Sequence, residues 1–335
     1  MTAFIHADWN RNFDEKSALL MQELPALQHP DYIQEYAFFQ NVREALLNNQ
    51  KCVRAVQRAA PEKKLRIQDR NLSIIIKKRR GNHIHDMYPW ELSYLLGAHS
   101  TILPSFPMEL GGKIIILQRL EPFATGKWGG GGYPKGFLRR VSLENYWKAH
   151  LLIYLLGISD LPETNVGVNS EGVIRLFDNE ASLIYYNTPS KSVRFFFSGF
   201  ICQSFDWPQY AMPLDEKTAN CLIDFVEGFS DFEENLKIYL KYRPVSVAHD
   251  ALQHRLNIVR SFPFREGATF RDFFGSVFPK MSPGLDELSC IMSQILKRKV
   301  HHGSALFFAS KTVKSADLSL EDRTKLQQWV NTYID

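Results

Sequence analysis

LGISDLPETN, at residues 156–165, and VIRLFDNE, at residues 173–180, carry the most informative pattern in the chain. An apolar run ends at Gly157, Asp160 stands five positions before Asn165, and a short apolar strand then leads into Asp178. In that order the three polar residues can serve as a general base and two ligands of a divalent cation. The pattern predicts a site of phosphoryl transfer, which requires an oriented hydroxyl and a cation on the phosphates.

This spacing resembles the catalytic loop and the metal-binding aspartate of the protein kinase superfamily. The family pattern of His-Arg-Asp, four residues, Asn and a later Asp-Phe-Gly matches at Asp160, Asn165 and Asp178. The resemblance implies that Asp160 orients the substrate hydroxyl, while Asn165 and Asp178 hold Mg²⁺ or Mn²⁺ beside ATP. Ile158–Ser159 replace His-Arg, and Asn179–Glu180 replace Phe-Gly. The alternative is an ordinary Asx turn, a loop asparagine and a strand-end aspartate.

An upstream strand and helix supply a predicted lysine and glutamate. NLSIIIKK, at residues 71–78, has the β-branched richness of a strand. It resembles the Val-Ala-Ile-Lys strand of kinases, which implies that Lys77 binds the ATP phosphates. YPWELSYLL, at residues 88–96, predicts a helix with Pro89 in its first turn, and the resemblance pairs its Glu91 with Lys77. The alternative is an exposed edge strand guarded by lysines.

Two antiparallel strands and a hinge are expected after this helix. The strands are predicted at residues 101–106 and 113–120, on either side of a turn at Gly111–Gly112. A strand with a lysine, a helix with a glutamate and two further strands follow one another as in the small lobe of a kinase. Gln118 and Leu120, beside the expected hinge, complete the predicted nucleotide-binding residues.

The glycine-rich loop that covers ATP in kinases is missing, because no glycine occurs between Met1 and Arg80. Basic side chains are the expected substitute. The candidates fall in three clusters, which are Lys63, Lys64, Arg66 and Arg70, then Lys78, Arg79 and Arg80 beside Lys77, then Lys297, Arg298 and Lys299. These features resemble an atypical bacterial effector kinase, which implies inositol hexakisphosphate as an activator bound by the clusters. The alternative is solvated surface.

Composition limits the class of protein. With 335 residues, 45% of them hydrophobic and 23% charged, the chain has material for two globular lobes. A net charge of +4 is too small to predict a nucleic-acid partner. No apolar run is long enough for a transmembrane segment, and the start lacks the pattern of a secretory signal. The four widely spaced cysteines are typical of a reducing compartment. We expect a cytoplasmic protein, or an effector secreted into a host cell cytosol.

The predicted architecture is an α+β, two-lobed, protein-kinase-like fold. It comprises an N-terminal helical extension at residues 1–60, an N-lobe at 61–122 and a mostly helical C-lobe at 123–335. Helical periodicity is predicted at residues 14–58, 142–156, 218–242, 285–297 and 319–333. The predicted activity is that of an atypical Ser/Thr/Tyr protein kinase with a protein substrate. The alternatives are a kinase of a lipid, sugar or antibiotic, and a catalytically inactive kinase fold that serves as a binding module.

Overall fold

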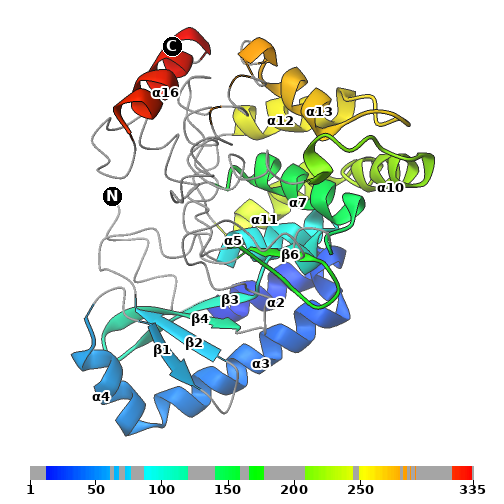
Figure 1. Ribbon diagram of the computed structural model, residues 1–335. Helices are drawn as coiled ribbons and strands as arrows, with labels where there is room; N and C mark the ends of the chain where they lie inside the picture. Colours follow the sequence, from blue (N-terminus) through cyan, green and yellow to red (C-terminus); the bar gives the residue numbers. More distant parts are fainter. Residues whose placement is uncertain are drawn as a thin grey trace. The chain divides into compact units, whose positions relative to one another are not determined.

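The computed structural model shows a mixed α+β protein, which confirms the expected class (Figure 1). The chain divides into two compact units, one made of Met1–Glu121 with Gly228–Ser246 and the other of Pro122–Glu227 with Val247–Asp335. The structure describes residues 13–60, 64–67, 72–76, 87–119, 140–158, 166–176, 208–243, 249–279, 282–284, 287, 291 and 319–333.

The first unit contains a four-stranded antiparallel sheet. Its strands are β1 (Lys64–Ile67), β2 (Leu72–Ile76), β3 (Ser105–Leu110) and β4 (Lys113–Arg119), in the order β1-β2-β4-β3. Gly111 and Gly112 both have positive φ, at 61° and 73°, in the turn between β3 and β4. Only glycine adopts this conformation without strain, so the turn forms where the sequence predicts it.

Strand β2 lies inside the sheet, between β1 and β4. The alternative of an exposed edge strand at residues 71–78 is therefore wrong. Ile74 and Ile75 are neighbours whose side chains point to opposite faces of the sheet, and both are buried. Because side chains on both faces of β2 are buried, its sequence is mostly apolar. Sequence reasoning did not predict β1.

Seven helical segments accompany this sheet among the residues described for the first unit. They are α2 (Phe13–Glu23), η1 (Pro25–Gln28), α3 (Pro30–Leu47), α4 (Gln50–Arg58), α5 (Met87–Leu95), η4 (His99–Thr101) and α11 (Phe232–Tyr242). The prediction of helix at residues 14–58 is confirmed. All nine residues of α5 are buried, as its almost wholly apolar sequence requires. Helix α5 contacts η1, β3 and α11, so it forms part of the core of this unit.

The second unit is mainly helical in its described residues. Its elements are α7 (Leu143–Leu156), β5 (Val166–Val168), β6 (Ile174–Leu176), η6 (Pro208–Tyr210), α10 (Glu216–Glu227), α12 (His249–Ser261), α13 (Phe270–Val277), η7 (Ser282–Gly284) and α16 (Leu320–Tyr333). Trp147 on α7 packs against an aromatic cluster at ring distances of 4.9 to 5.9 Å, made by Phe262, Phe264, Phe270 and Phe273. This cluster fixes α7 in the core of the unit.

The segment predicted as helix at residues 218–242 forms two helices, which end and begin around Gly228 and Asp231. Helix α10 belongs to the second unit, whereas α11 belongs to the first and contacts α2 and α5. Residues 228–246 therefore belong to the first unit, although they follow α10 in the sequence. The physical reason is that the apolar face of α11 is buried against α2 and α5.

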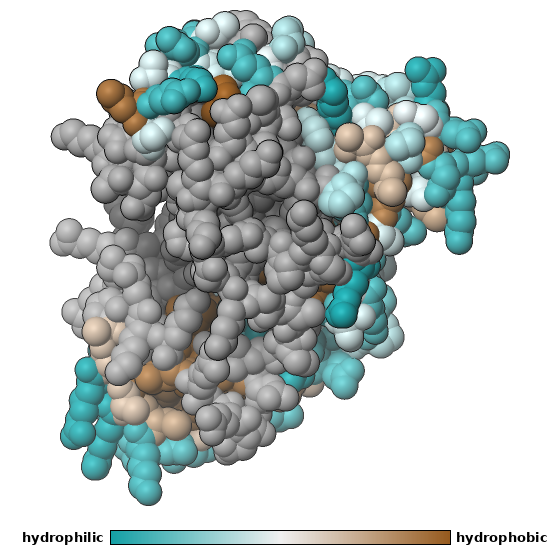
Figure 2. Space-filling view, in the orientation of Figure 1, coloured by the Kyte–Doolittle hydropathy of each residue, from teal (hydrophilic) through white to brown (hydrophobic). Residues whose placement is uncertain are grey.

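Hydrophilic residues dominate the described surface on the face drawn in Figure 2, with apolar residues in smaller groups. Among the described residues, the exposed large apolar side chains are far apart in the sequence, at Leu19, Ile33, Leu47, Met212 and Leu320. Single exposed apolar side chains are normal on a folded surface. Within the residues that the structure describes, no helix combines the length and the apolar character needed to cross a bilayer.

Candidate functional site

Two of the predicted site residues, Glu91 and Gln118, are described with their side chains, and for Lys64 and Arg66 the structure gives the backbone of β1. The other predicted catalytic and nucleotide-binding residues lie outside the described residues, namely Lys77, Leu120, Asp160, Asn165 and Asp178. The same holds for the basic candidates Lys63, Arg70, Lys78, Arg79, Arg80, Lys297, Arg298 and Lys299. The structure therefore describes the elements that flank these residues in the sequence.

Helix α7 leads into the segment that contains Asp160. Ser142 caps its start by accepting a hydrogen bond from the Asn145 N–H at 3.1 Å. Gly157 ends the helix with a left-handed conformation, φ 58°, and the Ile158 N–H donates to the Ile153 carbonyl at 3.0 Å. This is a Schellman motif, which satisfies the last carbonyls of the helix and turns the chain away from its axis. Ile158 is buried, so the exit of the chain is fixed by packing as well.

The hairpin of β5 and β6 lies between the positions of Asn165 and Asp178 in the sequence. Val166 pairs with Leu176, so the two ends of the hairpin are side by side. Its turn is organised by Asn169, whose side-chain oxygen accepts hydrogen bonds from the backbone N–H groups of Glu171 at 3.0 Å and Val173 at 2.9 Å. The Asn145 amide donates to the Gly172 carbonyl at 3.5 Å, which links the turn to the start of α7.

Gly172, in the turn between β5 and β6, has no room for a side chain. It has φ 79°, and a Cβ added there would lie 2.2 Å from the carbonyl oxygen of Arg140. We expect Gly172→Ala to lower the free energy of unfolding by about 3 kcal/mol, from left-handed strain and a backbone clash. Gly267→Ala is the matched control, because Gly267 also has positive φ, at 83°, but open space around it. Urea unfolding of both variants measures the difference, and equal losses would contradict the clash.

His150 lies at the centre of α7, and its burial there excludes it as a catalytic proton acceptor. The ring lies in the core, where its Nδ1 contacts the Tyr146 carbonyl at 2.7 Å and Phe270 packs on it at 4.8 Å. Burial lowers the pKa of His150 to about 3, against which the bond to Tyr146 acts weakly. The imidazole is therefore neutral near pH 7 and part of the packing of α7.

Glu91 is completely buried in the first unit and its carboxylate accepts four hydrogen bonds. One oxygen accepts from the Tyr32 hydroxyl at 2.8 Å and Arg243 Nη2 at 3.1 Å. The other accepts from the Tyr239 hydroxyl at 2.7 Å and Arg243 Nε at 3.1 Å. A carboxylate offers about four lone-pair positions, so this one is saturated. Pairing of Glu91 with Lys77 stays a prediction, and it would require one of these donors to leave.

Arg243 balances the buried charge of Glu91. Its side chain has no exposed surface, and Nη2 also donates to Ser17 Oγ at 2.7 Å. The guanidinium carbon lies 4.5 Å from the centre of the Phe13 ring, in cation–π contact. Burial opposes the charge on Arg243, but Glu91 outweighs that effect and raises the pKa of the guanidinium. The guanidinium therefore keeps its charge in the core, beside the Glu91 carboxylate.

The two tyrosines stay protonated and act as hydrogen-bond donors. Burial raises the pKa of Tyr32 and of Tyr239, and the neighbouring Glu91 carboxylate raises both further. Sequence reasoning missed Tyr32, Tyr239 and Arg243 as partners of Glu91. Arg243 lies 152 positions after Glu91, so no local pattern could have joined them.

Gln118 lies near the end of β4 and is buried. Its amide donates to Ser105 Oγ at 3.1 Å, across the paired strands β3 and β4. A nucleotide contact by this amide would require an exchange of partners. The next residue, Arg119, pairs with Glu35 of α3 at 2.8 Å and lies 3.6 Å over the Phe38 ring. The expected hinge therefore starts from a position fixed to α3.

Comparison with models of known protein families found no match, and comparison with curated proteins found no significant match.

Proposed function

We propose that the chain is an ATP-dependent phosphotransferase with a two-lobed, protein-kinase-like fold. The observation that supports it most is the order of elements around the three polar residues. Helix α7 precedes Asp160, and the β5–β6 hairpin stands between Asn165 and Asp178. Because Val166 pairs with Leu176, the hairpin brings together the backbone next to Asn165 and that two residues before Asp178. The first unit adds a strand, helix α5 and two strands in the order of a kinase small lobe.

Each residue has a role in this proposal. Asp160 orients the acceptor hydroxyl and takes its proton, and Lys77 holds the nucleotide phosphates. Asn165 and Asp178 supply the amide and carboxylate oxygens that Mg²⁺ or Mn²⁺ prefers. The bound cation would neutralise charge on the β- and γ-phosphates. The proposed acceptor is a Ser, Thr or Tyr hydroxyl of a protein, and the proposed place of action is the cytoplasm or a host cell cytosol.

Inositol hexakisphosphate is part of the proposal as an activator. Several lysines and arginines that line one pocket would bind a polyphosphate through strong charge-assisted hydrogen bonds. Two of the candidate residues, Lys64 and Arg66, lie in β1, which pairs with β2 in the same sheet. In this role the ligand would replace the neutralising effect of the missing glycine-rich loop.

A second candidate function is a catalytically inactive kinase fold that binds a partner. The saturated carboxylate of Glu91 favours it, because all four bonds are made with Tyr32, Tyr239 and Arg243. The absence of glycine ahead of the predicted lysine strand, between Met1 and Arg80, favours it as well. The two functions differ in whether phosphate is transferred.

The test is incubation of the full chain with labelled ATP and Mg²⁺ or Mn²⁺, with a protein mixture or a metabolite pool as acceptor. We expect cation-dependent transfer by the wild type and background transfer by Asp178→Ala. Asp224→Ala is the matched control, because Asp224 is an exposed carboxylate on α10. Label in the metabolite pool alone would assign a small-molecule kinase. Equal incorporation by wild type and Asp178→Ala would overturn the proposal.

The same reactions with and without inositol hexakisphosphate test the activator. We expect the rate to rise when it is added, and calorimetry at moderate salt to show saturable binding. An unchanged rate together with no saturable binding removes the activator from the proposal and leaves the phosphotransferase itself untouched.

A further inference from the structure

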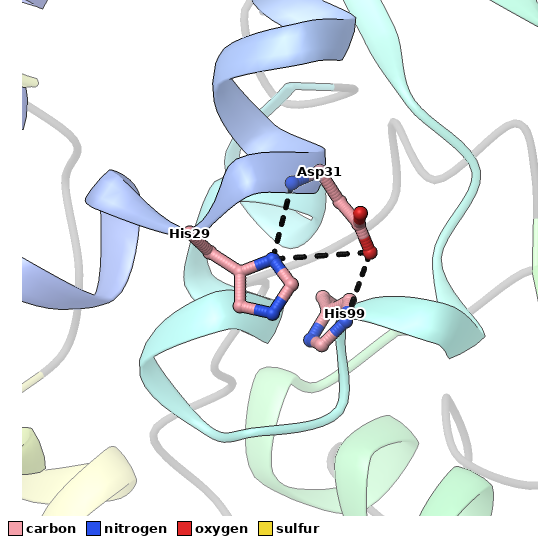
Figure 3. Close-up of side chains that lie close together, drawn as sticks. All are labelled: His29, Asp31 and His99. Atoms are coloured by element: carbon pink, nitrogen blue, oxygen red, sulfur yellow. Dashed lines mark hydrogen bonds and ion pairs between the residues drawn. The ribbon is translucent and has the colours of Figure 1, made fainter.

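His29, Asp31 and His99 converge in the first unit (Figure 3). His29 precedes α3, Asp31 lies in its first turn, and His99 begins η4, shortly after α5. Asp31 Oδ2 lies 3.8 Å from His29 Nδ1 and 3.7 Å from His99 Nε2. One ligand atom from each residue lies within 4.8 Å of the others. The sequence alone gives little signal for this cluster, because His99 is far along the chain from His29 and Asp31.

We propose that these three side chains bind a divalent transition metal, and that Zn²⁺ fits best. Two imidazole nitrogens and a carboxylate oxygen, with water in a fourth position, form a donor set that zinc uses in proteins. Tetrahedral coordination at about 2.0–2.1 Å places neighbouring ligand atoms about 3.4 Å apart. The two distances from Asp31 Oδ2 are only slightly longer, so small side-chain rotations would close the site.

The contacts of Asp31 Oδ2 with the two imidazoles are too long for hydrogen bonds. The oxygen thus faces a nitrogen of His29 and a nitrogen of His99 at ion-pair distance. A cation placed among the three ligand atoms would contact both imidazoles and the carboxylate at once.

Aromatic packing holds both imidazole rings in place. His99 stacks on the buried ring of Tyr94, at 4.7 Å and an interplanar angle of 13°. The His29 ring lies 4.6 Å from His99 and 5.7 Å from Tyr94. Ligands that are already oriented lose little conformational freedom when a metal binds. The site is therefore largely preformed.

The cluster is open to solvent. The exposed fraction of the side chain is 42% for His29, 63% for Asp31 and 30% for His99. A bound metal could therefore keep a water or an external ligand in its remaining position. The donor set contains nitrogen, unlike the oxygen ligands proposed for Mg²⁺ at Asn165 and Asp178, so this is a separate site of different metal preference.

Metal binding would join two distant parts of the first unit. His29 and Asp31 belong to the start of α3, and His99 follows α5, the helix that carries Glu91. His29 Nδ1 accepts a hydrogen bond from the Asp31 N–H at 3.2 Å and so caps α3, and a metal bound at this nitrogen would replace that bond. A metal that fixes these residues stabilises the folded first unit, because the unfolded chain does not hold the ligands together.

The experiment is a Zn²⁺ titration of the full chain in competition with a coloured chelator, together with thermal unfolding. We expect the wild type to bind about one equivalent and to melt at a higher temperature with Zn²⁺. His99→Gln and His29→Asn should each weaken binding at least about tenfold and abolish the shift in melting temperature. Asparagine is a good helix cap, so His29→Asn should fold as well as the wild type without metal.

His254→Gln is the matched control, because His254 is exposed on α12 and lies outside the cluster. This variant should bind Zn²⁺ like the wild type. Equal affinity of wild type and His99→Gln would overturn the proposal, as would no binding by the wild type. Substitution with Co²⁺ gives a further check, since a thiolate-to-cobalt charge-transfer band would place the metal on cysteines and overturn it too.

Discussion

Arg243→Met is expected to lower the free energy of unfolding by about 3–5 kcal/mol. The substitution leaves the carboxylate of Glu91 in the core without its cation, and both side chains have no exposed surface. Removal of one partner of a buried ion pair costs more than the pair contributes, because an uncompensated charge stays behind. Glu91→Leu should cost a similar amount, since it leaves the guanidinium alone. Urea unfolding and thermal unfolding measure both losses.

The double variant Glu91→Leu/Arg243→Met separates charge from packing. With both charges gone, we expect it to be clearly more stable than the sum of the two single losses predicts. It should still fall below the wild type, because the hydroxyls of Tyr32 and Tyr239 lose the acceptor to which they are bonded. A buried hydroxyl without a partner costs about 1–3 kcal/mol.

Arg54→Met is the matched control for this series. Arg54 is exposed on α4 in the same unit, so the same chemical change should alter stability by no more than about 0.5 kcal/mol. If Arg243→Met were as mild as Arg54→Met, the buried network would not hold α2, α3, α5 and α11 together. That outcome would contradict the interpretation of Glu91 as a structural centre of the first unit.

Elements with strong local signals could be predicted from the sequence. Helix α7 has a serine cap at Ser142 and a glycine stop at Gly157, and its bounds match the prediction closely. Strand β4 and the Gly111–Gly112 turn lie where the sequence predicts them, whereas the strand expected at residues 101–106 begins only at Ser105 and continues to Leu110. In each case a few neighbouring residues determine the backbone, so no knowledge of distant contacts is needed.

Features that depend on distant contacts could not be predicted in this way. The apolar spacing of Phe225, Phe229 and Phe232 continues through the break between α10 and α11, so periodicity alone favours one long helix. What separates the two helices is their packing in different units. Likewise, Lys241 and Tyr242 both donate to Glu23 on α2, a contact between residues more than two hundred positions apart.

In the candidate site too, some features could be predicted from local sequence and others depend on distant contacts. Sequence spacing brought Asp160, Asn165 and Asp178 into one hypothesis, and the structure adds helix α7 and the β5–β6 hairpin, which flank these positions in the sequence. The surroundings of Glu91 could not be foreseen, because its partners come from α3, α11 and the residue after α11. A glutamate in an apolar helix signals a buried partner, but the sequence does not say which one.

Asp160→Asn is expected to lower the rate of phosphoryl transfer about 10²- to 10⁴-fold, in the proposed kinase reaction. Asparagine keeps the size of the side chain but cannot accept the proton of the acceptor hydroxyl. The loss should appear in kcat, with little change in the KM for ATP, because Asp160 is not assigned to the nucleotide or the cation. Steady-state assays with varied ATP give both parameters.

Asp178→Asn should differ from Asp160→Asn in its response to the cation. Asp178 is assigned to the metal, so weakening its charge should raise the concentration of Mg²⁺ or Mn²⁺ needed for half-maximal rate. Asp160→Asn should leave that concentration unchanged. Asp224→Asn on α10 makes the same chemical change at an exposed position and should behave like the wild type. If both site variants changed kcat and cation dependence equally, the separate roles of base and metal ligand would be wrong.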